Sequence, residues 1–410
     1  MARFKINETR IVLFVLVLIA AAIRIWRMWE PDSFVFDEAY YADYANSLVT
    51  GKDWTDVHPP LAEGLISLMI RAFGNFAWVW RLLPVFFGIA NVPLICLFAR
   101  NITKNPKIGL IAAFLVTFDG LFLVHSRAAL LVSFVTFFVL CAYTAGSYFV
   151  RNFKMRWLVL ATLFMGMAIS TQWTAIPLWA ILALWLITAS PIKKHRIEAL
   201  IMLLLPLLVY MLVLLINCKA SYWSWILHWH NYALSFHLKL KGDHAFASRW
   251  YDWLYLRQPI TYYQSKLAEN YYASIVLLGN PVIWWSSIVA FGYSIYAMLY
   301  GRNKKYLFLP FITFSVFYFG WSVIGREQFL FYVLPVAPFL FVLLSNLLFD
   351  LYKKKATVFF GWIVLALAVF FFFYPLWVGR PISEKYFRAT QWLPDWKKIN
   401  IIDKENPSTS

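Results

Sequence analysis

Long runs of apolar residues alternate with short polar segments along most of the chain. The runs are roughly 17–25 residues long, which is the length that an α-helix needs to cross the hydrocarbon core of a bilayer. A helix satisfies its own backbone hydrogen bonds, as a chain in lipid must. The pattern therefore predicts an all-α, polytopic integral membrane protein. We expect about eleven transmembrane helices, near residues 11–28, 79–99, 108–125, 128–148, 156–170, 174–190, 198–217, 274–300, 306–324, 328–350 and 356–378.

Basic residues in the polar segments predict how these helices are oriented. Six segments carry three Lys or Arg each, and with eleven spans all six fall on the same side of the membrane. Because cytoplasmic loops are enriched in Lys and Arg, we assign this side, with the N-terminus, to the cytoplasm. The six segments lie at residues 3–10, 100–107, 151–156, 193–196, 302–305 and 353–355.

This alternation divides the chain into a membrane domain and an external tail. Residues 1–378 form the predicted transmembrane domain, and residues 379–410 form the tail. Two long loops, 29–78 and 218–273, also lie outside and hold most of the polar side chains. No small-residue cleavage site follows the first apolar run, so we interpret that run as a retained span rather than a signal peptide.

Composition agrees with this picture and narrows the possible partners. The chain is 62% hydrophobic and 14% charged, whereas a soluble domain has about 25% charged residues. The net charge of +17 is interpreted as loops held against anionic lipid, and no nucleic-acid partner is expected. The three cysteines indicate neither a disulfide framework nor a zinc site.

An acidic pair, Asp37 and Glu38, follows the first predicted span and opens a predicted external helix over residues 38–48. Asp37 and Tyr41 are four residues apart, so their side chains share a face. Acids at a helix start favour a capping role, because they interact well with the positive end of the helix. Capping and catalysis are compatible, and both interpretations stay open for the pair.

A histidine stands in the same predicted external loop. Pro59 and Pro60 follow His58 directly and restrict its backbone at the start of a second predicted external helix, residues 61–73. The arrangement is typical of a plain helix start. A rigid histidine near an acidic pair at one membrane surface is also typical of a substrate site.

Two predicted tight external turns each carry an arginine. Arg127 follows His125 and Ser126, and Arg326 is followed by Glu327. A guanidinium suits a phosphate, because its planar fork donates paired hydrogen bonds. The alternatives are that Arg127 extends to the membrane surface and that Arg326 pairs with Glu327.

These motifs together resemble the protein O-mannosyltransferase family of the GT-C glycosyltransferase superfamily, and its bacterial members in particular. Eight segments in the same order along most of the chain carry the resemblance. They read FDEAYYADYA, DVHPPL, RLLPVFFG, HSRAALL, GMAISTQWTAIPLW, HAFASRWYDW, GNPVIWW and REQFLFYVLPVAPF.

The resemblance implies inverting transfer of mannose from a polyprenyl (dolichyl-type) phosphate to Ser or Thr hydroxyls of secreted or membrane proteins, on the extracytoplasmic face. Asp37 would be the catalytic base and Glu38 its neighbour. Arg127, with Arg326 as a second candidate, would contact the carrier phosphate. We expect the remaining substrate contacts from His58, Tyr41, Glu327, Gln172 and Trp173.

The chain departs from the family pattern at several motif positions. The family motif His-Pro-Pro-x-Gly-Lys ends here in Ala62 and Glu63, and Ser-Thr-Lys-Trp has Gln172 in place of Lys. The arginine turn ends in Val132 where the family has Asp. These changes keep a second interpretation open. In it, a related GT-C enzyme passes an aminosugar or another sugar to a lipid, such as lipid A, or to a cell-wall glycan.

The chemistry needs few groups. Phosphate is already a good leaving group, so one carboxylate that accepts the proton of the incoming hydroxyl is sufficient, with cations to stabilise the departing phosphate. No Asp-x-Asp pair is present, and we expect neither a metal nor another cofactor. A transporter or flippase is the rival from another class. Its usual sign is charge deep in the membrane, and Asp119 is the only acid well inside a predicted span.

Overall fold

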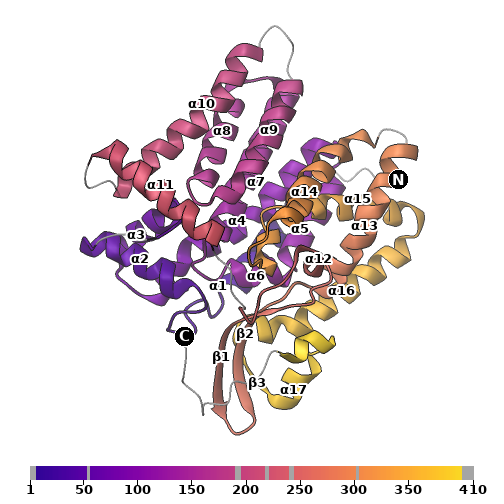
Figure 1. The fold of residues 1–410 in the computed structure, drawn as a ribbon. Helices are drawn as coiled ribbons and strands as arrows, with labels where there is room; N and C mark the ends of the chain where they lie inside the picture. The colour runs from indigo at the N-terminus through magenta and orange to yellow at the C-terminus, as the bar shows by residue number, and fades with distance from the viewer. Residues whose placement is uncertain are drawn as a thin grey trace.

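The computed structural model describes residues 6–52, 56–189, 195–217, 221–239, 244–301 and 304–398. In these ranges the chain forms a helical bundle with a small sheet at one end (Figure 1). The longer helices are α1 (Ile6–Ile25), α4 (Ala77–Thr103), α7 (Leu131–Asn152), α10 (His195–Leu214), α11 (Tyr222–Lys239), α13 (Pro281–Tyr300), α15 (Ala337–Lys354) and α16 (Ala356–Trp377). The shorter ones are α2 (Glu38–Thr50), α3 (Leu61–Phe73), α5 (Pro106–Thr117), α6 (Gly120–His125), α8 (Met155–Ile169), α9 (Ile176–Ala189), α12 (Trp250–Trp253), α14 (Phe308–Gly320) and α17 (Glu384–Ala389). Short 3₁₀ turns complete the helical elements: η1 (Trp173–Ala175), η3 (Leu215–Asn217), η4 (Lys305–Leu307), η5 (Trp321–Val323), η6 (Leu330–Val333) and η7 (Pro394–Lys398).

Six helical stretches among the described residues are long and apolar enough to cross a membrane. They are Ala77–Thr103, Leu131–Asn152, Ile197–Leu214, Pro281–Tyr300, Lys305–Val323 and Ala356–Trp377. Three shorter apolar helices, Pro106–Thr117, Met155–Ile169 and Trp173–Ala189, accompany them. All eleven predicted spans overlap helices, but the number that crosses the bilayer stays a prediction.

Helix α7 lies at the centre of the bundle, packed between α4 and α8, and is buried along most of its length. Helix α10 packs on α8 and turns an apolar face outward. The exposed side chains of that face are Leu200, Leu203, Leu204, Leu207, Leu208 and Leu212. An apolar face of this size in contact with water would be costly, and it suits contact with lipid. The chain is an integral membrane protein.

A small sheet corrects the expectation of an all-α fold. Strands β1 (Ile260–Ala268) and β2 (Tyr271–Leu277) form an antiparallel hairpin, and β3 (Pro381–Ser383) pairs with β2. The predicted span at 274–300 was wrong over its first residues, because 274–277 belong to β2 and α13 begins at Pro281. The sequence signal was there: β-branched and aromatic residues flank a short turn, which is typical of a hairpin.

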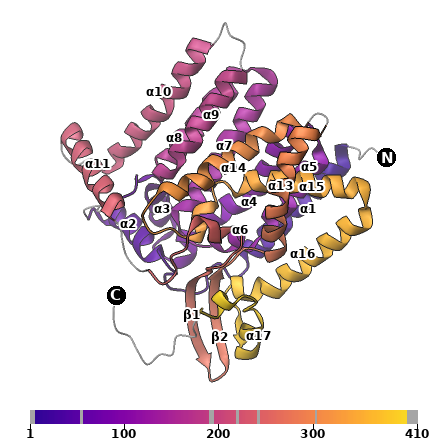
Figure 2. The ribbon, with the colours of Figure 1, turned by 45° about the vertical axis from the view of Figure 1, so that its right-hand side comes forward.

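The predicted external segments meet at one end of the molecule. Figure 2 shows the sheet and α17 together at that end, as does the view of Figure 1. The backbone N–H of Phe36 donates to the carbonyl of Tyr262 in β1 at 3.0 Å. Trp396, in the predicted tail, is fully buried and donates its indole N–H to the carbonyl of Leu256 at 2.6 Å. Contacts therefore join the first external loop, the second and the tail.

Basic residues from three of the predicted cytoplasmic segments meet elsewhere. The ammonium groups of Lys304 and Lys353 lie 3.0 and 2.9 Å from the carboxylate of Asp350. Lys107 lies over the ring of Tyr352 at 4.9 Å. These contacts support the grouping of these three basic segments on one side.

Asp119 has a structural role in the fold. Its carboxylate accepts hydrogen bonds from the backbone N–H groups of Phe122 (3.1 Å) and Asn280 (2.9 Å) and from the indole of Trp284 (2.7 Å). It thereby caps α6 and ties α6 to the start of α13. The buried acid that could have indicated transport is committed to these contacts.

Candidate functional site

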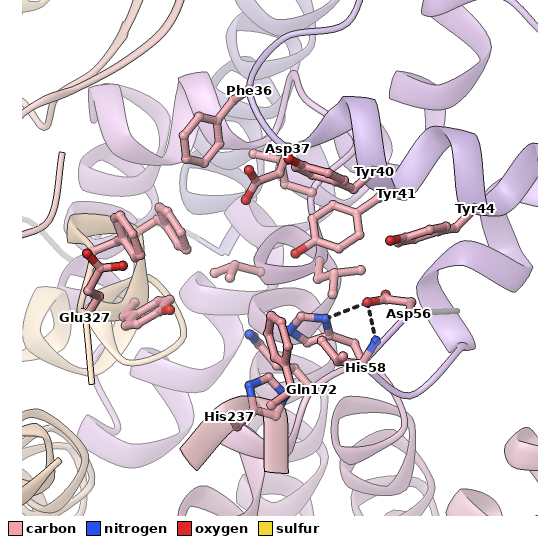
Figure 3. Close-up of a pocket in the computed structure, with 18 of the residues that line it drawn as sticks. Phe36, Asp37, Tyr40, Tyr41, Tyr44, Asp56, His58, Gln172, His237 and Glu327 are labelled. Carbon is pink, nitrogen blue, oxygen red and sulfur yellow. Dashed lines mark hydrogen bonds and ion pairs between the residues drawn. The ribbon is translucent and has the colours of Figure 1, made fainter. Parts of the chain in front are cut away.

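A cavity of about 520 Å³ lies among α2, α11, the segment around residues 56–58, the turn after α6 and residues 326–332. Figure 3 shows acidic, aromatic and imidazole side chains around this space. The structure brings most of the predicted site residues to its wall. Asp37, Tyr41, His58, Gln172, Arg326 and Glu327 all line it.

Asp37 presents its carboxylate to the cavity (Figure 3). It occupies the N-cap position of α2, yet its side chain makes no capping hydrogen bond. Asp37 therefore has the predicted position at the start of α2 but does not cap the helix through a side-chain hydrogen bond. Burial raises the pKa of Asp37 to about 6, opposed by the nearby His58 and assisted by the negative charge of Asp56. A carboxyl in such surroundings is poised to exchange a proton near neutral pH.

Glu38 faces away from the cavity and is fully buried. Its two oxygens accept hydrogen bonds from the guanidinium of Arg81 at 2.9 and 2.7 Å. They also accept from the backbone N–H groups of Val35 and Ala129. Consecutive side chains on a helix point about 100° apart, so one acid of the pair faces the cavity and the other faces the core. The structure therefore places Glu38 in the core, paired with Arg81, and not on the cavity wall that Asp37 lines.

The positioned histidine that the sequence predicted is present. His58 Nδ1 lies 3.1 Å from Asp56 Oδ1. The segment before it is anchored because Trp229 of α11 donates its indole N–H to the carbonyl of Asp56 at 3.1 Å. The ring of Tyr41 meets the ring of His58 edge-on at 6.0 Å. His58 therefore has a defined orientation at the cavity wall.

Arg326 lies on the side of the cavity formed by α11 and η6. Its guanidinium is 2.9 Å from Nδ1 of His237 and donates to the hydroxyl of Tyr332 at 2.8 Å. Burial, with the charges of His58 and Arg326, lowers the pKa of His237 to about 4, so this imidazole is neutral and accepts from Arg326. Glu327 accepts instead from the backbone N–H of His244 at 2.6 Å.

Arg127 is not part of the cavity wall. Its guanidinium donates to the backbone carbonyls at the end of α1 and just after it, those of Ile23, Arg24, Trp26 and Arg27. The neighbouring His125 does line the cavity and lies 2.8 Å from the hydroxyl of Tyr262. The geometry favours a structural role for Arg127 over contact with a phosphate.

An apolar groove of about 360 Å³ adjoins the cavity. Its walls are Trp173, Thr174 and Pro177 on one side and residues of α14 and η5, among them Phe317 and Trp321, on the other. The groove and the cavity share five residues: His58, Gln172, His237, Arg326 and Tyr332. We call these five the junction. Polar groups that bind hydrogen-bond acceptors thus stand where an apolar channel meets an acidic cavity.

Sequence reasoning missed the contribution of α11 to this site. His237 carried no motif signal, because it stands in a long aromatic stretch outside the recognised motifs. Nearby, Trp173 donates its indole N–H to Tyr210 at 3.0 Å, and the hydroxyl of Tyr210 lies 2.8 Å from Nε2 of His230 in α11. This chain of hydrogen bonds joins α11 and α10 to the groove wall, and only the folded structure reveals it.

Comparison with solved structures identifies the fold. The S. cerevisiae protein O-mannosyltransferase Pmt1-Pmt2 complex bound to the sugar donor matches 96% of this chain and 93% of its own, with a TM-score of 0.84 at 14% identity. ArnT from Cupriavidus metallidurans bound to undecaprenyl phosphate matches 88% of this chain and 64% of its own, with a TM-score of 0.60 at 16% identity. The fold is that of the GT-C membrane glycosyltransferases.

Sequence comparison then gives the family. A family model for dolichyl-phosphate-mannose-protein mannosyltransferase matches residues 14–222, and a model for the C-terminal four TMM region of protein-O-mannosyltransferase matches residues 222–396. The chain belongs to the protein O-mannosyltransferase family, as the motifs predicted, and it is a glycosyltransferase.

Curated relatives agree with this assignment over most of their length. The polyprenol-phosphate-mannose–protein mannosyltransferase of Corynebacterium glutamicum is 23% identical over 463 aligned residues, covering 88% of each chain. The enzyme of the same name from Mycobacterium tuberculosis is 23% identical and covers 88% of this chain and 86% of its own.

Proposed function

We propose that this protein transfers mannose from a polyprenyl phosphate to Ser or Thr hydroxyls of proteins, with inversion at the anomeric carbon. One observation carries the proposal. An apolar groove and a cavity containing Asp37 share a polar junction that includes Arg326. A lipid-linked sugar phosphate has the matching order of parts: an apolar tail, an anionic phosphate and a polar sugar.

The donor would lie across the two spaces. Its first isoprene units would occupy the groove beside Trp173 and Trp321. Its phosphate would accept hydrogen bonds at the junction, where Arg326 supplies the positive charge. The sugar would then extend into the cavity towards Asp37. Gln172, which lines both spaces, replaces a cation in the family motif and offers an uncharged amide there.

The chemistry is a single displacement. The acceptor oxygen forms a bond to the anomeric carbon while the bond from that carbon to the phosphate oxygen breaks. Asp37 takes the proton of the acceptor hydroxyl, and the phosphate leaves with the electron pair. The guanidinium of Arg326 stabilises the negative charge that develops on the phosphate. Attack opposite to the leaving group inverts the configuration.

The site is proposed to face the extracytoplasmic side. The positive-inside distribution of Lys and Arg places the basic segments in the cytoplasm, and Asp37 lies in a loop on the other side of that assignment. The cavity would then meet secreted or membrane proteins, while the donor reaches the groove from the bilayer. An extracytoplasmic site would therefore be accessible to both the protein acceptor and the lipid-linked donor.

A direct assay tests the proposal. The purified protein in detergent is mixed with polyprenyl-phosphate-mannose and a peptide that contains Ser or Thr. We expect a mannosyl peptide whose anomeric configuration is opposite to that of the donor. Retention of configuration, or transfer confined to lipid or glycan acceptors offered in parallel, would overturn the proposed reaction.

A further inference from the structure

Two buried acids stand behind His58, and one of them, Glu63, has no part in the site as described so far. Asp56 is 4% exposed and Glu63, in the first turn of α3, is fully buried. Asp56 Oδ1 is engaged by His58 Nδ1 at 3.1 Å and by the backbone N–H of Val57 at 2.5 Å. The remaining oxygens of the two acids, Asp56 Oδ2 and both of Glu63, are buried and have no hydrogen-bond partner among the described residues. This pair lies directly behind one of the five junction residues.

These unpartnered oxygens need a donor, and a proton on one of the two carboxyl groups would supply it. Two ionised carboxylates cannot donate to each other, and placing both charges in the interior would be very costly. One carboxyl must therefore be neutral. Asp56 has the imidazole and a backbone N–H as donors, so Asp56 is the ionised partner and Glu63 holds the proton.

The shifts in pKa agree with this assignment. Burial and the charge of Asp56 raise the pKa of Glu63 well above its ordinary value. The neighbouring His58, Glu63 and Val57 N–H lower the pKa of Asp56 despite its burial. Their surroundings therefore lower the pKa of Asp56 and raise the pKa of Glu63.

We propose that Glu63 is a positioning residue for the transfer site: its neutral carboxyl donates to Asp56, and Asp56 in turn holds the His58 ring at the junction. The inference rests on the proposed function of that site. Glu63 stands where the family motif has a lysine. A protonated glutamic acid keeps a hydrogen-bond donor at this position without the positive charge. The departure from the motif thus becomes a substitution of one donor for another.

A dependence on pH follows. Loss of the Glu63 proton at high pH would put two negative charges side by side and break the hydrogen bond between them. The imidazole would then be drawn towards a doubly charged pair. The titratable groups that face the acids and His58 are Asp37 and Tyr41 from α2, His237 from α11 and, beyond it, Arg326. Because the pKa of Glu63 is raised in the folded protein, the proposed hydrogen bond from Glu63 to Asp56 is present at lower pH. It is lost as the pH rises through the pKa of Glu63.

Three substitutions test the role of Glu63. Glu63→Gln keeps the size and a donor but cannot ionise, so we expect kcat within about threefold of wild type and an alkaline limb of activity shifted to higher pH. Glu63→Ala removes the donor, and we expect kcat to fall about tenfold or more, the usual scale for the loss of a supporting hydrogen bond. In a His58→Ala background, Glu63→Ala should have little further effect, because Glu63 acts through His58. Glu269→Gln, in the exposed hairpin turn, is the matched control.

An infrared measurement is independent of catalysis. The difference spectrum of wild type minus Glu63→Gln, taken at neutral pH, should contain the C=O stretch of a protonated carboxylic acid. Absence of that band, an unchanged alkaline limb in Glu63→Gln, or full additivity of Glu63→Ala with His58→Ala would each overturn the inference. If wild type forms no mannosyl product at all, the proposed function fails, while the infrared band still decides whether Glu63 carries the proton.

Discussion

Asp37 and Glu38 are adjacent in sequence but have opposite surroundings. One carboxylate faces a cavity without a capping bond, and the other is paired with Arg81 in the core. The same division separates His125, which lines the cavity, from Arg127, which binds the end of α1. The direction of a side chain, set by local backbone geometry, thus decides which residue of a motif reaches the cavity and which packs in the core.

Asp37→Asn should abolish transfer while the protein still folds. Removing a general base lowers the rate about 100-fold or more, and the amide has nearly the same shape as the acid. The thermal midpoint should be unchanged or higher, because a buried charge is no longer required. The measurement is initial rate and melting of purified protein, with Asp43→Asn on the exposed side of α2 as control. A rate within about twofold of wild type would contradict the role of base.

The pH profile gives a second test of Asp37. Since burial raises its pKa to about 6, the base form is lost as pH falls through that value. We expect kcat/KM for the acceptor to decline below about pH 6 and to level off above it. A limb near the ordinary Asp value of about 4 would show that another group limits the rate.

Substitution of Arg326 and substitution of Arg127 should affect different properties, donor binding for the first and stability for the second. Arg326→Ala removes the junction cation, and we expect the donor KM to rise about tenfold or more, the effect of losing a charge-assisted contact. Arg127→Ala removes a donor that four backbone carbonyls near the end of α1 share, and the main effect should be a lower melting temperature. A large donor effect of Arg127→Ala in a protein that melts normally would restore Arg127 as a phosphate ligand.

At the scale of elements, the site depends on helices that the hydrophobic pattern cannot position. Apolar periodicity located the helices and the loop with Asp37, because burial in lipid and burial in protein both require apolar residues. It did not reveal that α11 packs over the site, since its aromatic residues are typical of both a membrane surface and a helix contact. The hairpin 260–277 was missed for a related reason: its second strand is apolar enough to be taken for the start of a span.

Tyr210→Phe tests how far the groove depends on α11. The substitution removes the hydroxyl that joins Trp173 to His230 and leaves the rest of the ring in place. We expect the donor KM to rise several-fold with little change in kcat, because the groove wall loosens while Asp37 stays in position. Tyr386→Phe, which removes a partly buried hydroxyl contact to Phe372 outside the groove wall, should change neither parameter. Equal effects of both substitutions would indicate general destabilisation instead.

In the molecule as a whole, the predicted external segments lie together, and basic residues of the predicted cytoplasmic segments lie together in a different region. The loop with Asp37, the hairpin and the buried Trp396 are joined by contacts, while Lys304, Lys353 and Lys107 gather around the α15–α16 region. Because Phe36 bonds to Tyr262 in β1, the side on which the hairpin lies is also the side from which Asp37 is reached. The side of the membrane on which the hairpin lies is therefore the side on which the proposed transfer would take place.

Cysteine labelling in intact cells measures that orientation. The background is a variant in which Cys96, Cys141 and Cys218 are replaced. In it, Asn270→Cys marks the hairpin turn and Lys355→Cys marks the connection between α15 and α16, both at exposed positions. A membrane-impermeant maleimide should label position 270 in intact cells and position 355 only after permeabilisation, because the basic segments are retained in the cytoplasm. Retained transfer activity shows that each variant is folded. The reverse labelling pattern would place Asp37 on the cytoplasmic side, where secreted acceptors are absent, and would contradict the proposed reaction even though the fold and the family remain as described.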